Sequence, residues 1–239
     1  MGTVYMDEKT RTLLACGVIA GPLFVVTFLA EGATRAGYEP LRHPVSSLAL
    51  GEHGWMQTAN FVVAGLLTLA FAVGMRRVSP KLSIRGPLLV GVWAIGLIGA
   101  GIFPTDPVSG YPPGTPDKLT GYSWHGAIHD LAFSLPGFVA LAAACFVFCR
   151  WFAGRGDRRW AVYSALTGLV FSVSFILASA GFGQAEVLVH LAGLFQRVAV
   201  AVGFGWLTLL AVHSLRSSPG GQPGSSRSED PPAAGRVGR

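Results

Sequence analysis

The sequence predicts an all-α fold, a polytopic integral membrane helical bundle of about six transmembrane helices with both termini cytoplasmic. Three observations support this prediction. Hydrophobic residues make up 51% of the 239 residues and charged residues only 13%, about half of the roughly 25% usual in soluble domains. Six apolar runs are close to or above the length of about 18 residues that crosses a bilayer. Basic residues gather in alternate connections between these runs.

The six apolar runs are the predicted spans. The first is longer than the roughly 7–15 apolar residues of a signal-peptide core, and five more follow it, so we interpret it as a retained signal anchor. The second is slightly short, and Arg197 interrupts the last. The expected organisation is an N-terminal segment 1–12, a transmembrane domain 13–215 with spans at about 13–30, 59–75, 86–103, 127–149, 161–181 and 187–212 and outer loops 31–58, 104–126 and 182–186, and a C-terminal tail 216–239.

The basic residues predict the orientation in the membrane. Fourteen of the 18 Lys and Arg residues lie in the N-terminal segment, two alternate connections and the tail, whereas three lie in the outer loops. The positive-inside rule therefore places both termini in the cytoplasm, and we expect a multi-pass protein of the bacterial cytoplasmic membrane. No basic stripe with interleaved aromatic residues suggests nucleic acid, so the lipid bilayer is the expected partner. The tail, rich in Gly, Pro and Ser, is expected to be disordered.

Small residues and prolines inside the spans predict how the helices pack. Glycines that recur in the first and third spans allow close helix approach. Pro22 and Pro136 lie inside spans, where each removes a backbone hydrogen bond and is expected to kink its helix. All three cysteines fall inside spans without a CxxC pair, a pattern that favours neither a disulfide framework nor a zinc–cysteine site.

Polar residues around the last span indicate a site inside the bundle. In one continuous helix, Glu186, His190, Gly193 and Arg197 would share a narrow face, with Arg197 about 16 Å deeper than Glu186. Ionisable residues at such depth nearly always face the bundle interior or a water-filled cavity. The expected neighbours lie at the outer ends of other spans: Asp106, Trp124, His125, His129 and Asp130.

Three stretches of the chain resemble a known family. These are "GYEPLRHPVSSLALGEHGWMQTANFVVAGLL" from Gly37, "GIFPTDP" from Gly101, and Gly121 placed four residues before His125. They are similar to the prokaryotic membrane proteins grouped as domain of unknown function 998, over residues 12–213. The resemblance implies a six-helix integral membrane protein, and it implies no activity, substrate or catalytic residue.

The polar residues favour an outward-facing cavity that binds a small polar or anionic ligand or a lipid headgroup. Arg197 would supply the buried countercharge. The side chains expected to line the site with it are Trp124, His129 and His190. A purely structural alternative is an ion pair of Arg197 with Asp130 or Glu186 that only locks the bundle.

Metal chemistry is the main enzymatic alternative. The pairs His125–His129 and Glu186–His190 each have the i, i+4 spacing that presents two ligands on one helix face. Together they could hold zinc or another divalent metal in a hydrolase that acts at the outer leaflet, although no HExxH motif is present.

Three further functions stay open. His129 and His190 could ligate haem. Ser46 or Ser47 with His43 could form a nucleophile–base pair, although the sequence has no GxSxG elbow. Transport is a third possibility, although residues 1–110 and 111–215 show no convincing internal repeat. The oligomeric state is not predicted.

Overall fold

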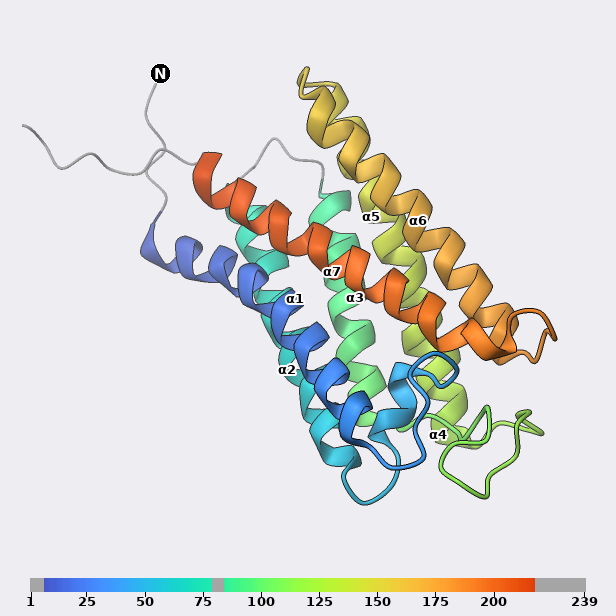
Figure 1. The fold of residues 1–239 in the computed structure, drawn as a ribbon. Coiled ribbons are helices and arrows are strands. Elements are labelled where there is room, and N and C mark those ends of the chain that lie inside the picture. Colours follow the sequence, from blue (N-terminus) through green and yellow to red (C-terminus); the bar gives the residue numbers. More distant parts are fainter. Residues whose placement is uncertain (1–6, 79–83, 218–239) are drawn as a thin grey trace, which may run out of the picture.

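A computed structural model describes residues 7–78 and 84–217, and six of the helices in these ranges are long and apolar enough to cross a bilayer (Figure 1). This confirms the predicted class of an all-α multi-pass membrane protein. The spans are α1 (Glu8–Thr34), α2 (Gly54–Val78), α3 (Arg85–Ile102), a composite span (Trp124–Ala153), α6 (Arg158–Phe182), and α7 (Ala192–Ser217) preceded by the short 3₁₀ helix η3 (Val189–Leu191). The predicted disordered tail, apart from residues 216–217, lies outside the described residues.

The helices form a closed ring. Each packs against two neighbours in the order α1, α2, α3, α5, α6, α7 and back to α1. The first residue of α1 and the last of α7 lie at one end of the ring, here called the terminal end (Figure 1). The opposite end, the loop end, holds the first loop (residues 35–53), the second loop (103–123) and the third loop (183–188).

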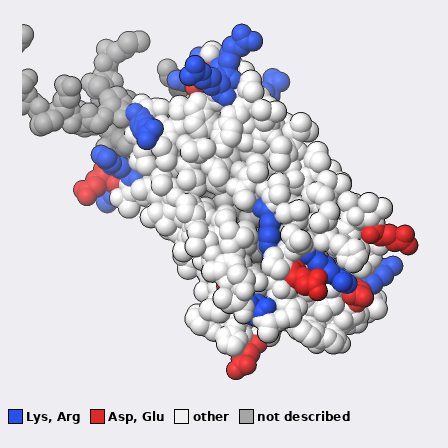
Figure 2. Space-filling model, viewed as in Figure 1, with Lys and Arg blue, Asp and Glu red and all other residues white. Residues whose placement is uncertain are grey.

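Charged side chains gather at the two ends of the molecule, and the belt between them is almost free of charge (Figure 2). Exposed residues of this belt include Ile19, Leu66, Ile95, Val139 and Ile176. A side surface of this kind suits acyl chains rather than water. That the terminal end faces the cytoplasm stays a prediction from the positive-inside rule.

Glycines allow two of the helix crossings to be very close. A Cβ on Gly21 in α1 would lie 2.9 Å from the carbonyl oxygen of Phe204 in α7. A Cβ on Gly96 in α3 would lie 2.8 Å from the carbonyl oxygen of Phe133 in the composite span. Since a backbone carbonyl lies within 3.0 Å in both cases, and Thr208 Oγ1 is closer still at Gly21, alanine at either position would force the helices apart.

The composite span changes helix type near the loop end. The short α4 (Trp124–Ala127) continues into the π-helical η2 (Ile128–Ser134) and then into α5 (Leu135–Ala153). Leu135 N–H donates to the carbonyl oxygen of Asp130, five residues back. Pro136 follows directly, and because it has no N–H and crowds the preceding turn, it favours this local widening. Pro22, in contrast, lies within an uninterrupted α1.

Aromatic rings meet across the axis of the ring of helices. Trp93 of α3 lies 5.8 Å from Phe204 of α7 and 6.2 Å from Phe171 of α6, between ring centroids, although neither helix is its neighbour. Phe138 lies 5.2 Å from Trp93, and Phe24 lies 5.0 Å from Phe204. We call these five side chains the aromatic floor. It fills the middle of the bundle and leaves the loop-end half to the site described next.

Candidate functional site

Arg197 lies inside the bundle with 8% of its surface exposed, and it binds the first loop. Its Nη1 donates to the carbonyl oxygens of His43 at 3.1 Å and Gly193 at 3.0 Å. Its Nη2 donates to the hydroxyl of Tyr38, which donates in turn to the carbonyl oxygen of Pro44 at 2.9 Å. Arg197 makes no ion pair within the described ranges, so the predicted pair with Asp130 or Glu186 is not present.

The surroundings of Tyr38 keep its hydroxyl protonated beside the permanently charged Arg197. Burial raises the pKa of Tyr38 to about 12, although Arg197 acts in the opposite direction. The phenol therefore stays protonated at neutral pH and keeps the hydrogen that it donates. The rings of Phe28 and Tyr38 cover the guanidinium at 5.8 and 5.4 Å. Arg197 thus fixes the first loop to α7 through dipoles and ring faces.

The first turns of α7 bind the same loop at two further points. Leu194 N–H donates to the carbonyl oxygen of Leu41 at 2.9 Å, and Val45 N–H donates to Oε1 of Gln196 at 2.7 Å. Backbone groups of a loop that enters a membrane bundle need such partners, because lipid offers none. Residues 43–48 of the first loop are therefore part of the packed interior.

The predicted shared face of Glu186, His190, Gly193 and Arg197 is wrong. Gly183 and Gln184, the latter with φ of 67°, end α6, and the chain then turns until α7 begins at Ala192. Glu186 and His190 are both exposed outside the α-helix. Arg197 lies only five residues into α7, which is why the backbone of the first loop reaches it and why the predicted depth of about 16 Å does not apply.

His43 joins the first loop to the second. Its Nδ1 accepts from Glu39 N–H at 2.8 Å, and its Nε2 donates to the carbonyl oxygen of Ser109 at 3.1 Å. Burial lowers the pKa of His43; Glu39 acts in the opposite direction, and the cations Arg42 and Arg197 lower it further. The neutral ring uses both nitrogens, so neither can serve as the base for the predicted serine nucleophiles, Ser46 and Ser47.

The FPTDP turn is tied to the start of the composite span. His129 Nδ1 donates to the carbonyl oxygen of Phe103 at 2.7 Å, and His125 Nδ1 lies 3.0 Å from the carbonyl oxygen of the next residue. Asp106 Oδ2 accepts from Ser123 N–H at 2.9 Å, at the first turn of the span, where a negative charge is favoured. The His-xxx-His spacing therefore serves the fold by binding successive backbone carbonyls.

A cavity of about 460 Å³ occupies the loop-end half of the ring. All six spans and the first two loops contribute to its wall. Trp93, Phe24 and Phe138 of the aromatic floor close its inner end. From Trp93 to Ala100, the wall follows α3 for seven residues, about 10 Å.

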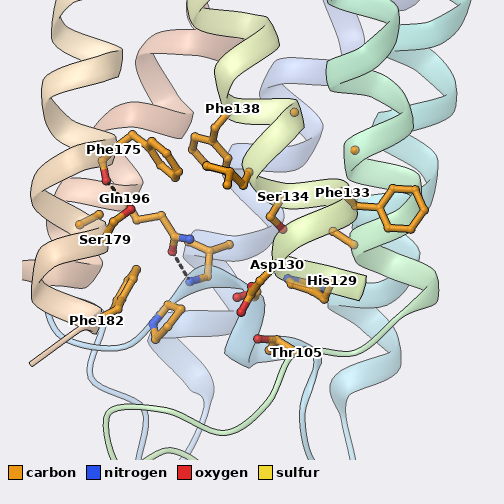
Figure 3. Close-up of a pocket in the computed structure, with 18 of the residues that line it drawn as sticks. Thr105, His129, Asp130, Phe133, Ser134, Phe138, Phe175, Ser179, Phe182 and Gln196 are labelled. Atoms are coloured by element: carbon orange, nitrogen blue, oxygen red, sulfur yellow. Dashed lines mark hydrogen bonds between the residues drawn. The ribbon is translucent and has the colours of Figure 1, made fainter. Parts of the chain in front are cut away.

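The cavity has a polar middle and an aromatic inner end. Figure 3 shows Asp130, Ser134 and Gln196 around one space, with Phe138 and Phe175 further inside. The cavity also reaches the apolar side of the bundle, because two of its lining residues, Leu131 and Leu135, are 56% and 45% exposed. Leu131 belongs to η2, which packs on α3, and Leu135 is the first residue of α5.

The structure brings three of the eight predicted site residues to this cavity: Asp106, His129 and Asp130. Trp124 and His125 lie at the same end without lining it. Glu186, His190 and Arg197 do not line it either. The predicted role of Arg197 as the countercharge of a ligand in the site is therefore not supported by its position.

The predicted metal and haem ligands are not assembled. Within residues 7–78 and 84–217, no three His, Cys, Asp or Glu side chains lie close enough together to hold a metal ion. Of the four zinc candidates, His125 and His129 use Nδ1 on backbone carbonyls, and Glu186 and His190 are exposed. The haem pair fails in the same way, since His129 is buried and His190 is exposed on the surface.

Several lining residues were not predicted. Ser134, Ser179 and Gln196 each interrupt an apolar run and line the cavity, and for the partly buried Ser134 and Gln196 that interruption is a usable signal of an interior position. Trp93 carries no such signal. Its indole N–H is buried and has no acceptor within the described ranges, which only the three-dimensional packing reveals.

Comparison with known proteins adds a family to this geometry. No curated protein and no solved structure matches the chain. The family described as "Protein of unknown function (DUF998)" matches residues 18–213, most of the described bundle, and this confirms the resemblance noted from the loop motifs. The chain therefore belongs to this family of proteins of unknown function.

Proposed function

We propose that the protein binds an amphiphilic small molecule in the loop-end cavity. The polar part of the molecule would lie near Asp130 and Ser134, and its apolar part against the aromatic floor. The supporting observation is a cavity of about 460 Å³ that joins a polar middle to an aromatic inner end. Small-molecule sites have volumes of roughly 300–1,000 Å³ and a mostly apolar wall with a few placed polar groups.

The route into the cavity favours a ligand from the bilayer. Leu131 and Leu135 belong both to the cavity wall and to the exposed apolar side of the bundle. If the terminal end is cytoplasmic, as the basic residues predict, this opening lies in the outer leaflet of the bacterial cytoplasmic membrane. An amphiphile could then move sideways from that leaflet into the cavity.

Binding is favoured over the hydrolase alternative by the chemistry of the wall. The described residues assemble no metal-ligand set, and His43, the base expected for Ser46 or Ser47, uses both ring nitrogens on the backbone. The purely structural alternative accounts for Arg197 and the first loop. It does not account for an open space beside Asp130.

The test uses the purified protein in lipid nanodiscs and a dansyl-labelled dodecanol as a neutral amphiphile. Energy transfer from tryptophan to dansyl should saturate, and excess unlabelled dodecanol should reverse it. Ala178→Phe, which fills the cavity from α6, should weaken binding by about tenfold or more, equivalent to about 1.4 kcal/mol. Ala180→Phe, at an exposed position of the same helix, should bind as the wild type does.

A second filling variant guards against misfolding. Ala100→Phe approaches the same space from α3, and each variant is judged only on monodisperse protein. Saturable binding that neither filling variant weakens, or the lack of any saturable transfer in the wild type, would overturn the proposal.

A further inference from the structure

We infer that the amphiphile bound in the cavity is a cation, an amine whose ammonium group pairs with Asp130. The inference rests on the proposed binding function and adds the charge of the ligand to it. It reverses the anionic ligand expected when Arg197 was placed in the site.

Asp130 lines the cavity, and its side chain has no partner among the described residues. It belongs to the π-helical η2, its side chain is half-buried, and it lines the cavity beside Ser134 (Figure 3). No hydrogen bond or ion pair joins its carboxylate to any residue of 7–78 or 84–217. A carboxylate can accept about four hydrogen bonds, and removing it from water is costly unless it is paired.

None of the described charged groups near Asp130 forms an ion pair with it. Asp106 carries the same charge and is satisfied by Ser123 N–H. His129 donates its Nδ1 hydrogen to a backbone carbonyl, which in the neutral ring leaves Nε2 as an acceptor. Lys118 reaches the cavity wall from the second loop without forming an ion pair with Asp130. Asp130 therefore lines the cavity without an ion-pair partner among the described residues, and a bound cation would supply one.

Tyr122, which is 51% exposed, lies near the same two carboxylates. Tyr122 lines the cavity from the second loop. Burial raises the pKa of Tyr122, and the carboxylates of Asp130 and Asp106 raise it further. Both carboxylates thus act on the same space, where they attract positive charge.

A second unpaired group lies at the inner end. Trp93 is 2% exposed and lines the cavity, and its indole N–H has no acceptor within the described residues. A buried donor without an acceptor costs about 1–3 kcal/mol, so a ligand oxygen that reaches it is favoured. Together, the two groups describe an amine at the polar middle of the cavity and a hydrogen-bond acceptor further along the molecule.

Arg197 does not supply a positive charge for a ligand in the cavity. Its guanidinium is used on Tyr38 and on the backbone of the first loop, and it does not line the cavity. An anionic headgroup would therefore meet Asp130 and Asp106 without a matching buried charge.

The experiment compares three dansyl-labelled probes of equal chain length in nanodiscs of zwitterionic lipid at pH 7: dodecylamine, dodecanol and dodecanoate. The wild type should bind the amine at least about tenfold more tightly than the alcohol, a difference of about 1.4 kcal/mol. Asp130→Asn should abolish this preference and leave the affinity for the alcohol unchanged. Asp130→Ser repeats the test if the first variant is not monodisperse.

Glu186→Gln is the matched control. It removes an exposed acid at the same end of the bundle that does not line the cavity, so the preference for the amine should persist. Equal affinity of the wild type for amine and alcohol, tighter binding of dodecanoate, or an unchanged preference in Asp130→Asn would overturn the inference. If no probe binds saturably to the wild type, the proposed binding function itself is refuted.

Discussion

Replacing Gly193 by alanine should release the first loop, whereas the same replacement at Gly205 in α7 should be harmless. A Cβ on Gly193 would lie 2.6 Å from the carbonyl oxygens of both Pro40 and His43, while one on Gly205 would meet nothing within 4 Å. Alanine favours a helix over glycine by about 1 kcal/mol. Gly205→Ala should therefore raise the free energy of unfolding by about that amount or leave it unchanged.

The cost at Gly193 follows from the bonds that the loop would lose. Because ordinary van der Waals contact begins at 3.4 Å, the loop must retreat by most of an ångström. This movement breaks the bond from Leu194 N–H to Leu41 and the bond from the Arg197 guanidinium to His43. At about 1 kcal/mol for the neutral bond and roughly 2 kcal/mol for the charge-assisted one, the docked loop loses about 3 kcal/mol.

Hydrogen exchange measures this loss directly. If the loop opens locally, a loss of about 3 kcal/mol speeds exchange of the amides of residues 38–48 by roughly a hundredfold. Mass spectrometry of the wild type and both variants in nanodiscs compares the same peptide. Exchange in Gly193→Ala that matches the wild type and Gly205→Ala would refute the conclusion that the first turn of α7 holds the loop.

Two further perturbations test the loop contacts. Gly126→Ala would place a Cβ against the carboxylate of Asp106 and should lower the free energy of unfolding by about 2 kcal/mol, measured as a lower midpoint of thermal unfolding. In the control Gly121→Ala the new Cβ meets nothing within 4 Å, so the midpoint should not change. Equal midpoints for the two variants would contradict the conclusion that Asp106 binds the second loop to the composite span. His43 is favoured as a neutral ring, so its contribution to stability should be full above its unfolded pKa of about 6.5 and should be lost as the pH falls through its lowered pKa. Unfolding midpoints from pH 8 to pH 5 should fall less steeply for His43→Asn than for the wild type, and parallel curves would contradict this.

The spans were predictable because lipid requires them. A chain that crosses hydrocarbon must satisfy its backbone within each segment, so long apolar runs read as helices almost without ambiguity. The start of α7 was not predictable in this way. Four of the five residues 187–191 are apolar, but these residues form a turn and the short 3₁₀ helix η3 before α7, and Val187 is 88% exposed. Hydropathy therefore extended the last α-helix beyond its true beginning.

The partners of Arg197 show a second limit of the sequence. That a guanidinium in a span needs polar neighbours could be predicted from its solvation energy. Its neighbours are Tyr38 and a carbonyl oxygen 154 positions away in the sequence, and a carbonyl oxygen belongs to every residue. One sequence feature does point to this contact: Gly193 lies four residues before Arg197, and because Gly193 has no side chain the first loop can approach α7 closely.

The cavity was predictable in part. Asp106, His129 and Asp130 were expected near the outer ends of the spans, and they line it. The remaining lining depends on how η2 rotates the residues after His129, and on which ring of the aromatic floor ends the cavity. Neither the helix type nor the packing of Trp93 is encoded in a local pattern of the sequence.

The aromatic floor also acts as a barrier to the passage of ions through the bundle. A hollow that admits water from one face shortens the barrier that ions must cross, and each cell depends on that barrier to store its proton gradient. The five rings of the floor are 0–8% exposed and meet on the axis. An ion would have to shed its hydration shell to pass them, as at the hydrophobic gate of a channel. The floor therefore lets the bundle hold a cavity in its loop-end half while the rest of the bundle stays closed to ions.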